Sequence, residues 1–129
     1  MDVLADRTVL IYDMDCGFCT RSATWIESHW SGDDRPRLVG GQMLADADLA
    51  AHGLTRERLA KEAVWVDGPT VLGGSDAIAA SMRAATGWVH VLGVLISLPG
   101  LRQLGRLVYP VVARHRHQMP GATDACRID

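Results

Sequence analysis

The spacing of apolar and polar positions predicts alternating strands and helices along most of the chain. The apolar, β-branched run Thr8–Tyr12 is typical of a strand that is buried on both faces. A helix is expected directly afterwards, over about 17–30, because Phe18, Trp25 and Ile26 share one helical stripe. Further strands are predicted over residues 37–39, 63–67 and 70–72, with the turn dipeptide Gly68-Pro69 between the last two.

Helical patterns fill the segments around these later strands. Residues 42–62 form two short helical pieces that separate at a glycine, and Thr55 is placed to cap the second piece. After the predicted hairpin, Ser75 or Asp76 caps a helix that runs to about residue 86 and ends at the next glycine.

Two more helices are predicted at the C-terminal end, over 88–98 and 101–117. Pro110 should kink the second one, because proline cannot donate the helical hydrogen bond. One face of that helix is apolar and carries Leu101, Leu104, Leu107, Val108, Val111 and Val112. The helix over 88–98 has an apolar stripe of its own, which we interpret as core, with packing on a partner as the alternative. Its members are Trp88, Val91, Leu92 and Leu95.

The order β-α-β-α-β-β-α, followed by extra helices, predicts an α/β fold of thioredoxin-like arrangement. The opening β-α-β unit makes two strands parallel and the later pair forms a hairpin, which gives a mixed four-stranded sheet with flanking helices. The 129 residues suit a single domain. We expect its core over about 7–87, a C-terminal helical extension over about 88–118 and an irregular tail over 119–129.

Composition and charge narrow the class of protein. Hydrophobic residues make up 48% and charged residues 22%, as in ordinary globular proteins. The net charge of −2 argues against a general nucleic-acid binder, which needs a basic surface. The last quarter is nevertheless basic, so it presents either a solvated helix face or a dock for an anionic ligand, partner or membrane surface; its arginines are Arg102, Arg106, Arg114 and Arg116.

The apolar pattern predicts neither export nor membrane insertion. Met1–Arg7 lacks the basic and apolar regions of a signal peptide, and Val89–Leu98 is too short to span a bilayer. We therefore expect a cytoplasmic protein without a transmembrane segment. In that reducing compartment, chemistry or metal binding explains three cysteines better than structural disulfides do.

The strongest chemical signal is Cys16-Gly17-Phe18-Cys19, at the junction of the first strand and the first helix. At this spacing the two cysteines occupy one helical turn, within reach of a disulfide. The N–H groups and the positive dipole end of the helix favour a thiolate. We expect Cys16 to be the more exposed sulfur and the nucleophile, with Cys19 as the resolving thiol. A half-built zinc site and inert buried cysteines are the alternatives.

Asp13 and Asp15 stand immediately before the cysteine pair. Their negative charge should raise the pKa of the Cys16 thiol and oppose the helix dipole. Either an aspartate takes up or returns a thiol proton during exchange, or Asp15 only caps the helix, a role that Asp13 could also fill. An Asp-x-Asp pair after an apolar strand also resembles haloacid-dehalogenase-type phosphohydrolases, which use Mg²⁺. That chemistry also requires a lysine and an acidic pair nearer the C-terminal end. The only lysine here is Lys61, and the C-terminal segment is basic.

The motif from Tyr12 to Cys19, followed by Trp25, resembles the DCC family of thiol–disulfide oxidoreductases. The resemblance extends from about Thr8 to Arg127, and its further matches are Gly74–Ile78, Tyr109–Arg116 and Cys126. It implies a thioredoxin-like fold and a dithiol active site, and it does not identify a substrate. We expect the dithiol to exchange disulfides with a protein or a low-molecular-weight thiol, without a metal.

Two smaller features have two interpretations each. The segment containing Gly74, Ser75 and Asp76 resembles the glutaredoxin element that holds the γ-glutamyl end of glutathione, and a glycine-rich turn at a helix N-terminus can bind a carboxylate. It is either such a site, with glutathione as co-substrate and no other cofactor, or an ordinary capped turn. Cys126 is either a third redox thiol that the tail brings back to Cys16 or a surface thiol without a role.

Overall fold

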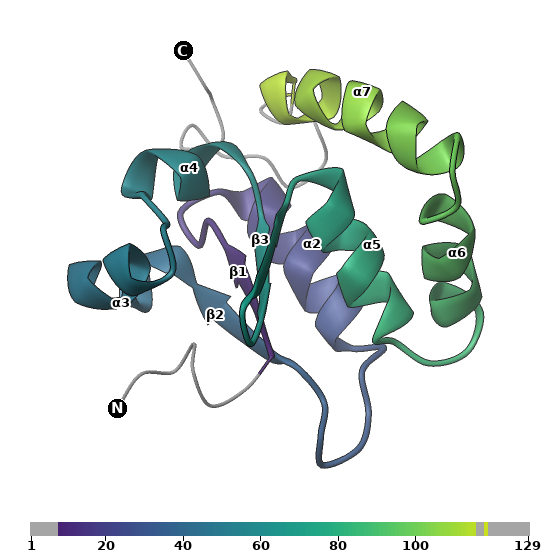
Figure 1. Ribbon diagram of the computed structural model, residues 1–129, viewed down its shortest axis with the longest axis horizontal. Coiled ribbons are helices and arrows are strands. Elements are labelled where there is room, and N and C mark those ends of the chain that lie inside the picture. The colour runs from purple at the N-terminus through teal and green to yellow at the C-terminus, as the bar shows by residue number, and fades with distance from the viewer. Residues whose placement is uncertain (1–7, 116–117, 119–129) are drawn as a thin grey trace.

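The centre of the molecule is a four-stranded mixed sheet, seen in the computed structural model, which describes residues 8–115 and 118 (Figure 1). Strand β1 pairs in parallel with β2 and antiparallel with β3, and β3 pairs antiparallel with β4. The spatial order is β2-β1-β3-β4. The predicted thioredoxin-like α/β fold is thus confirmed, and its strands are β1 (Val9–Tyr12), β2 (Arg37–Gly40), β3 (Val64–Asp67) and β4 (Thr70–Gly73).

Strand β1 occupies the middle of the sheet because its side chains are apolar on both faces. Val9 and Ile11 are fully buried in a cluster with Leu49 and Leu59, which come from the helical segment between β2 and β3. Leu10 is buried in a second cluster, on the other face of the sheet, with residues of the helices that follow β1 and β4. The sheet therefore lies between two layers of helix, each of which covers one apolar face.

The helices match the predicted order and differ mainly in their ends. Thr55 caps α4 as expected, since its hydroxyl accepts from the N–H of Arg58 at 3.1 Å. The helical elements are α2 (Gly17–Glu27), the 3₁₀ turn η1 (Gly41–Met43), α3 (Asp46–Ala51), α4 (Arg56–Lys61), α5 (Ser75–Arg83), α6 (Trp88–Ile96) and α7 (Leu101–Arg114).

Helices α2 and α5 end three residues earlier than the sequence predicts, and their last residues bond elsewhere. After α2, Trp30 donates its indole N–H to the carbonyl of Ser81 in α5, at 2.9 Å. After α5, Thr86 donates both its backbone N–H and its hydroxyl to the carbonyl of His29. These tertiary hydrogen bonds join the ends of the two helices.

The predicted caps of α5 are wrong. Ser75 and Asp76 lie inside the helix, and Gly74 is its N-cap with φ 62°. A left-handed φ is accessible to glycine at little cost, so the chain turns into the helix one residue earlier than a serine or aspartate cap would allow.

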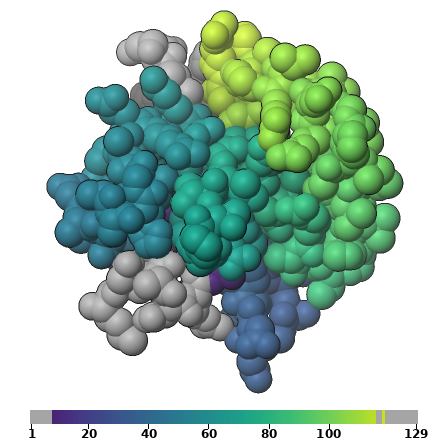
Figure 2. All heavy atoms as spheres, in the orientation of Figure 1, coloured from purple at the N-terminus to yellow at the C-terminus, as the bar shows by residue number. Residues whose placement is uncertain are grey.

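The interpretation of the α6 stripe as core is also wrong. Trp88, Val91, Leu92 and Leu95 are 62%, 55%, 38% and 45% exposed. Helix α6 instead buries its other side against α5, and α7 continues across the outer surface, where none of residues 101–114 is buried (Figures 1 and 2).

Over residues 8–115 and 118, no single helix has the length and hydropathy needed to cross a membrane. Helices α6 and α7 meet that standard only as a pair, which is bent by 96° at the break between them.

Candidate active site

The two predicted redox cysteines lie where β1 ends and α2 begins. The N–H of Cys16 donates to the carbonyl of Asp13 at 3.3 Å, which turns the chain into the helix. Cys16 is then the N-cap, and its Sγ accepts the backbone N–H of Cys19 at 3.4 Å. A sulfur at this place meets the positive end of an 11-residue helix, which favours a thiolate. The prediction that Asp15 or Asp13 caps α2 is therefore wrong, because the cysteine itself fills the cap.

The exposures of the two sulfur residues are the reverse of those predicted. Cys16 is fully buried, and its Sγ accepts the backbone N–H of Cys19. Cys19 is partly exposed. The helix terminus thus lies at one cysteine, whereas solvent reaches the other.

Gln42 in η1 holds the turn in front of the cysteines, and the sequence analysis missed it. Its Nε2 donates to Asp13 Oδ1 at 2.7 Å and to Asp15 Oδ2 at 3.1 Å. Its Oε1 accepts the backbone N–H of Met14 at 3.1 Å. The parallel pairing of β1 and β2 could have suggested this contact, since the carboxyl ends of parallel strands meet at one edge of a sheet.

A largely apolar cavity of about 630 Å³ opens beside Cys19. Its walls include residues of β1, α2, α4 and α5, and the C-terminal helices α6 and α7 contribute to it as well. Asp13 and Ser75 also line the cavity, which brings parts of two predicted site segments together with Cys19.

The predicted carboxylate-binding turn is already in contact with other side chains. A Cβ on Gly74 would lie 3.2 Å from a carboxylate oxygen of Glu62 and 3.3 Å from the ring of Tyr109. A ligand carboxylate at this turn would meet the negative charge of Glu62, although binding of glutathione through Gly74, Ser75 and Asp76 stays a prediction.

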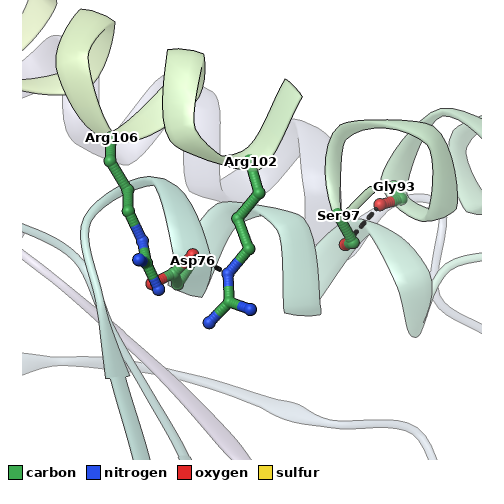
Figure 3. Close-up of polar contacts among 5 residues, drawn as sticks. All are labelled: Asp76, Gly93, Ser97, Arg102 and Arg106. Atoms are coloured by element: carbon green, nitrogen blue, oxygen red, sulfur yellow. Dashed lines mark hydrogen bonds and ion pairs between the residues drawn. The ribbon is translucent and has the colours of Figure 1, made fainter. Parts of the chain in front are cut away.

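Asp76 faces away from that turn and towards α7. Its carboxylate pairs with Arg106 at 2.9 Å and with Arg102 at 3.4 Å (Figure 3). These contacts give Asp76 a role in holding α7 against α5.

The alternative of a metal site would need a cluster of possible ligands in the part of the chain that the structure describes. There, no group of three or more histidine, cysteine, aspartate or glutamate side chains is arranged to hold a metal ion. Cys126 lies outside the described residues, so its predicted redox role stays a prediction.

The sequence matches one family model. The model of the DCC1-like thiol-disulfide oxidoreductases covers residues 10–122, a range that includes both cysteines and Gln42. Neither a curated protein nor a solved structure matches the chain.

Proposed function

The chain belongs to the DCC1-like thiol-disulfide oxidoreductase family, and on this premise we propose that Cys16 and Cys19 form the dithiol that exchanges disulfides with its substrate. The observation that carries the proposal is the position of Cys16 Sγ at the N-cap of α2, 3.4 Å from the backbone nitrogen of Cys19. The substrate is a protein disulfide or a low-molecular-weight disulfide, and glutathione disulfide is the first of these to test.

The reaction proceeds in two exchange steps. The thiolate of Cys16 attacks one sulfur of the substrate disulfide, so a bond forms to that sulfur and the other half leaves as a thiolate. Cys19 then loses its proton and attacks Cys16 Sγ, which releases the second half as a thiolate and closes the Cys16–Cys19 disulfide. The substrate gains two electrons and the dithiol loses two. The same steps in reverse oxidise a substrate dithiol.

We assign the first attack to Cys16 because the helix N-terminus stabilises its thiolate. Its burial means that the surroundings of Cys16 have to open when the substrate disulfide arrives. Asp13 lines the same cavity as Cys19, which makes it the candidate acceptor for the Cys19 proton, while Asp15 shapes the turn through Gln42.

A single-turnover trapping experiment tests the pair. The fully reduced protein is mixed with glutathione disulfide in a Cys126→Ser background, so that no third thiol competes, and intact mass is recorded. We expect an internal disulfide in the parent protein, a stable mixed disulfide on Cys16 in Cys19→Ser, and no product in Cys16→Ser.

Other outcomes have defined meanings. A mixed disulfide on Cys19 in Cys16→Ser would reverse the order of attack. Absence of both internal and mixed disulfides, with glutathione disulfide and with a small aromatic disulfide, would reject the proposal. Mg²⁺-dependent hydrolysis of a phosphoester by the variant lacking both Cys16 and Cys19 would support the Asp-x-Asp alternative instead.

A further inference from the structure

We infer that the cavity beside Cys19 binds an apolar group carried by the disulfide substrate, so that the protein selects disulfides by hydrophobicity rather than by carboxylates. This inference rests on the proposed function and adds a substrate class to it. It is carried by the position, size and lining of the cavity.

The cavity has the size and chemistry of a binding site for an apolar group. Its volume of about 630 Å³ lies within the range of small-molecule pockets, roughly 300–1,000 Å³. Side chains from four helices make its apolar walls: Phe18, Trp25, Ile26, Ile78, Met82, Ile96, Val108 and Val112. Binding an apolar group against such walls is favourable because it removes hydrocarbon from water.

The charges that reach the cavity do not suit a ligand rich in carboxylates. Among the described residues that line it, Arg21 is the cation, and it is exposed. Glu62 and Asp13 are negative; Glu62 is paired with Arg58 at 2.7 Å, and Asp13 accepts from Gln42. A ligand with two carboxylates, such as glutathione, would therefore find one cation and two anions.

The cavity lies where a bound group would influence exchange. Cys19 lines it directly, next to Phe18 on the first turn of α2. An apolar group held against Phe18 places its attached sulfur near the cysteine pair, which raises the effective concentration of the substrate disulfide there. Helix α7 contributes Val108 and Val112 to the walls.

A homologous series of disulfides tests the inference on the unmodified protein. Mercaptoethanesulfonate is joined to linear alkanethiols of two to eight carbons, which keeps every member soluble and varies the buried hydrocarbon. Each methylene that leaves water should raise the second-order rate constant of single-turnover exchange up to roughly fourfold, until the cavity is filled.

Two neighbouring variants of α7 test whether the cavity is responsible. Val108→Trp fills space in the cavity and should flatten the dependence on chain length. Leu107→Trp adds the same side chain at a position that is 73% exposed and outside the lining, so it should keep the full dependence. Thermal unfolding of both variants confirms that they fold.

A second set of substrates, made from peptides, distinguishes two possible origins of the apolar group: a side chain of a protein substrate or the carbon chain of a small thiol. Cysteine peptides with leucine or serine beside the cysteine are joined to the same sulfonate. Faster reaction of the leucine peptide identifies a side chain as an occupant, and a slope in the alkane series identifies a small thiol. Equal rates throughout both arms would overturn the inference while exchange itself stands, whereas no exchange with any member would reject the proposed function.

Discussion

At the scale of single residues, two opposed electrostatic effects act on the sulfur of Cys16. The N–H groups at the start of α2 favour its thiolate, and the carboxylates of Asp13 and Asp15 oppose it. Gln42 acts on the carboxylates, because its amide N–H groups donate to both of them. The amide therefore offsets part of the negative charge of the turn that precedes Cys16.

Removing this amide should make Cys16 a weaker nucleophile at neutral pH. In Gln42→Ala the carboxylate charge is less compensated, so we expect the pH midpoint of the exchange rate to rise and the rate at pH 7 to fall by about threefold. Gln42→Glu adds a charge and should move the midpoint further in the same direction. The measurement is a pH profile of single-turnover exchange with a small disulfide.

The control for Gln42 is its neighbour Met43, which is 73% exposed. Met43→Ala should leave the profile unchanged. An unchanged midpoint in both Gln42 variants would show that the carboxylates of the turn do not influence Cys16.

The sequence predicted the cysteine pair well and its surroundings poorly, for identifiable reasons. The spacing of Cys16 and Cys19 after an apolar strand is a local signal, and it located the pair correctly at the start of α2. The contact of Gln42 with Asp13 joins residues 29 positions apart, and only the parallel pairing of β1 and β2 brings them together. The burial of Cys16 depends on the tertiary packing around it, which spacing does not determine.

At the scale of elements, the close crossing of α5 and α6 depends on one glycine. A Cβ on Gly93 would lie 2.6 Å from the backbone nitrogen of Arg83 and 2.7 Å from the carbonyl carbon of Met82. Both are backbone atoms, so a side chain at this position would force the two helices apart.

We therefore expect Gly93→Ala to lower the free energy of unfolding by about 2 kcal/mol, since overpacking outweighs the gain in helix propensity. Gly105 in α7 provides the matched control, because its Cβ would meet Ser75 Cβ at an ordinary 3.4 Å. Gly105→Ala should be neutral or stabilising by up to about 1 kcal/mol. Urea unfolding at one temperature measures both, and equal effects would contradict the close crossing.

The elements themselves were predictable, and their ends were not. Local periodicity and turn residues predicted every strand, the hairpin at Gly68-Pro69 and the cap at Thr55. The ends of α2 and α5 are set by hydrogen bonds between Trp30 and Ser81 and between Thr86 and His29, which a local pattern does not contain.

At the scale of the whole molecule, the two C-terminal helices are attached to the core in different ways. Helix α6 buries Val89 and Gly93 against α5, whereas none of residues 101–114 of α7 is buried. The contacts of α7 with the core include the pairs of Asp76 with Arg102 and Arg106, and the Tyr109 hydroxyl, which accepts from the N–H of Ala63 at 3.0 Å. The amphipathic pattern predicted both helices, but a helical stripe does not reveal whether core or solvent lies against it.

This arrangement predicts that α7 opens without unfolding the sheet. Segments with few buried apolar side chains unfold locally at a small fraction of the global free energy. Asp76→Ala removes both ion pairs from a carboxylate that is 21% exposed, and surface pairs contribute about 0–1 kcal/mol each. Amide hydrogen exchange in α7 should become about three- to tenfold faster, while exchange in β1 stays unchanged.

Asp46 offers the control, since its carboxylate also pairs with an arginine, Arg56 at 2.9 Å, but is 87% exposed and belongs to α3. Asp46→Ala should leave exchange in α7 as it is. If Asp76→Ala accelerates amide hydrogen exchange equally in β1 and α7, the helix unfolds together with the core. The part of the cavity wall that α7 contributes would then be as rigid as the sheet. If α7 alone responds, the wall of the cavity that contains Val108 can open independently, which gives a bulky disulfide a route into the cavity beside the cysteine pair.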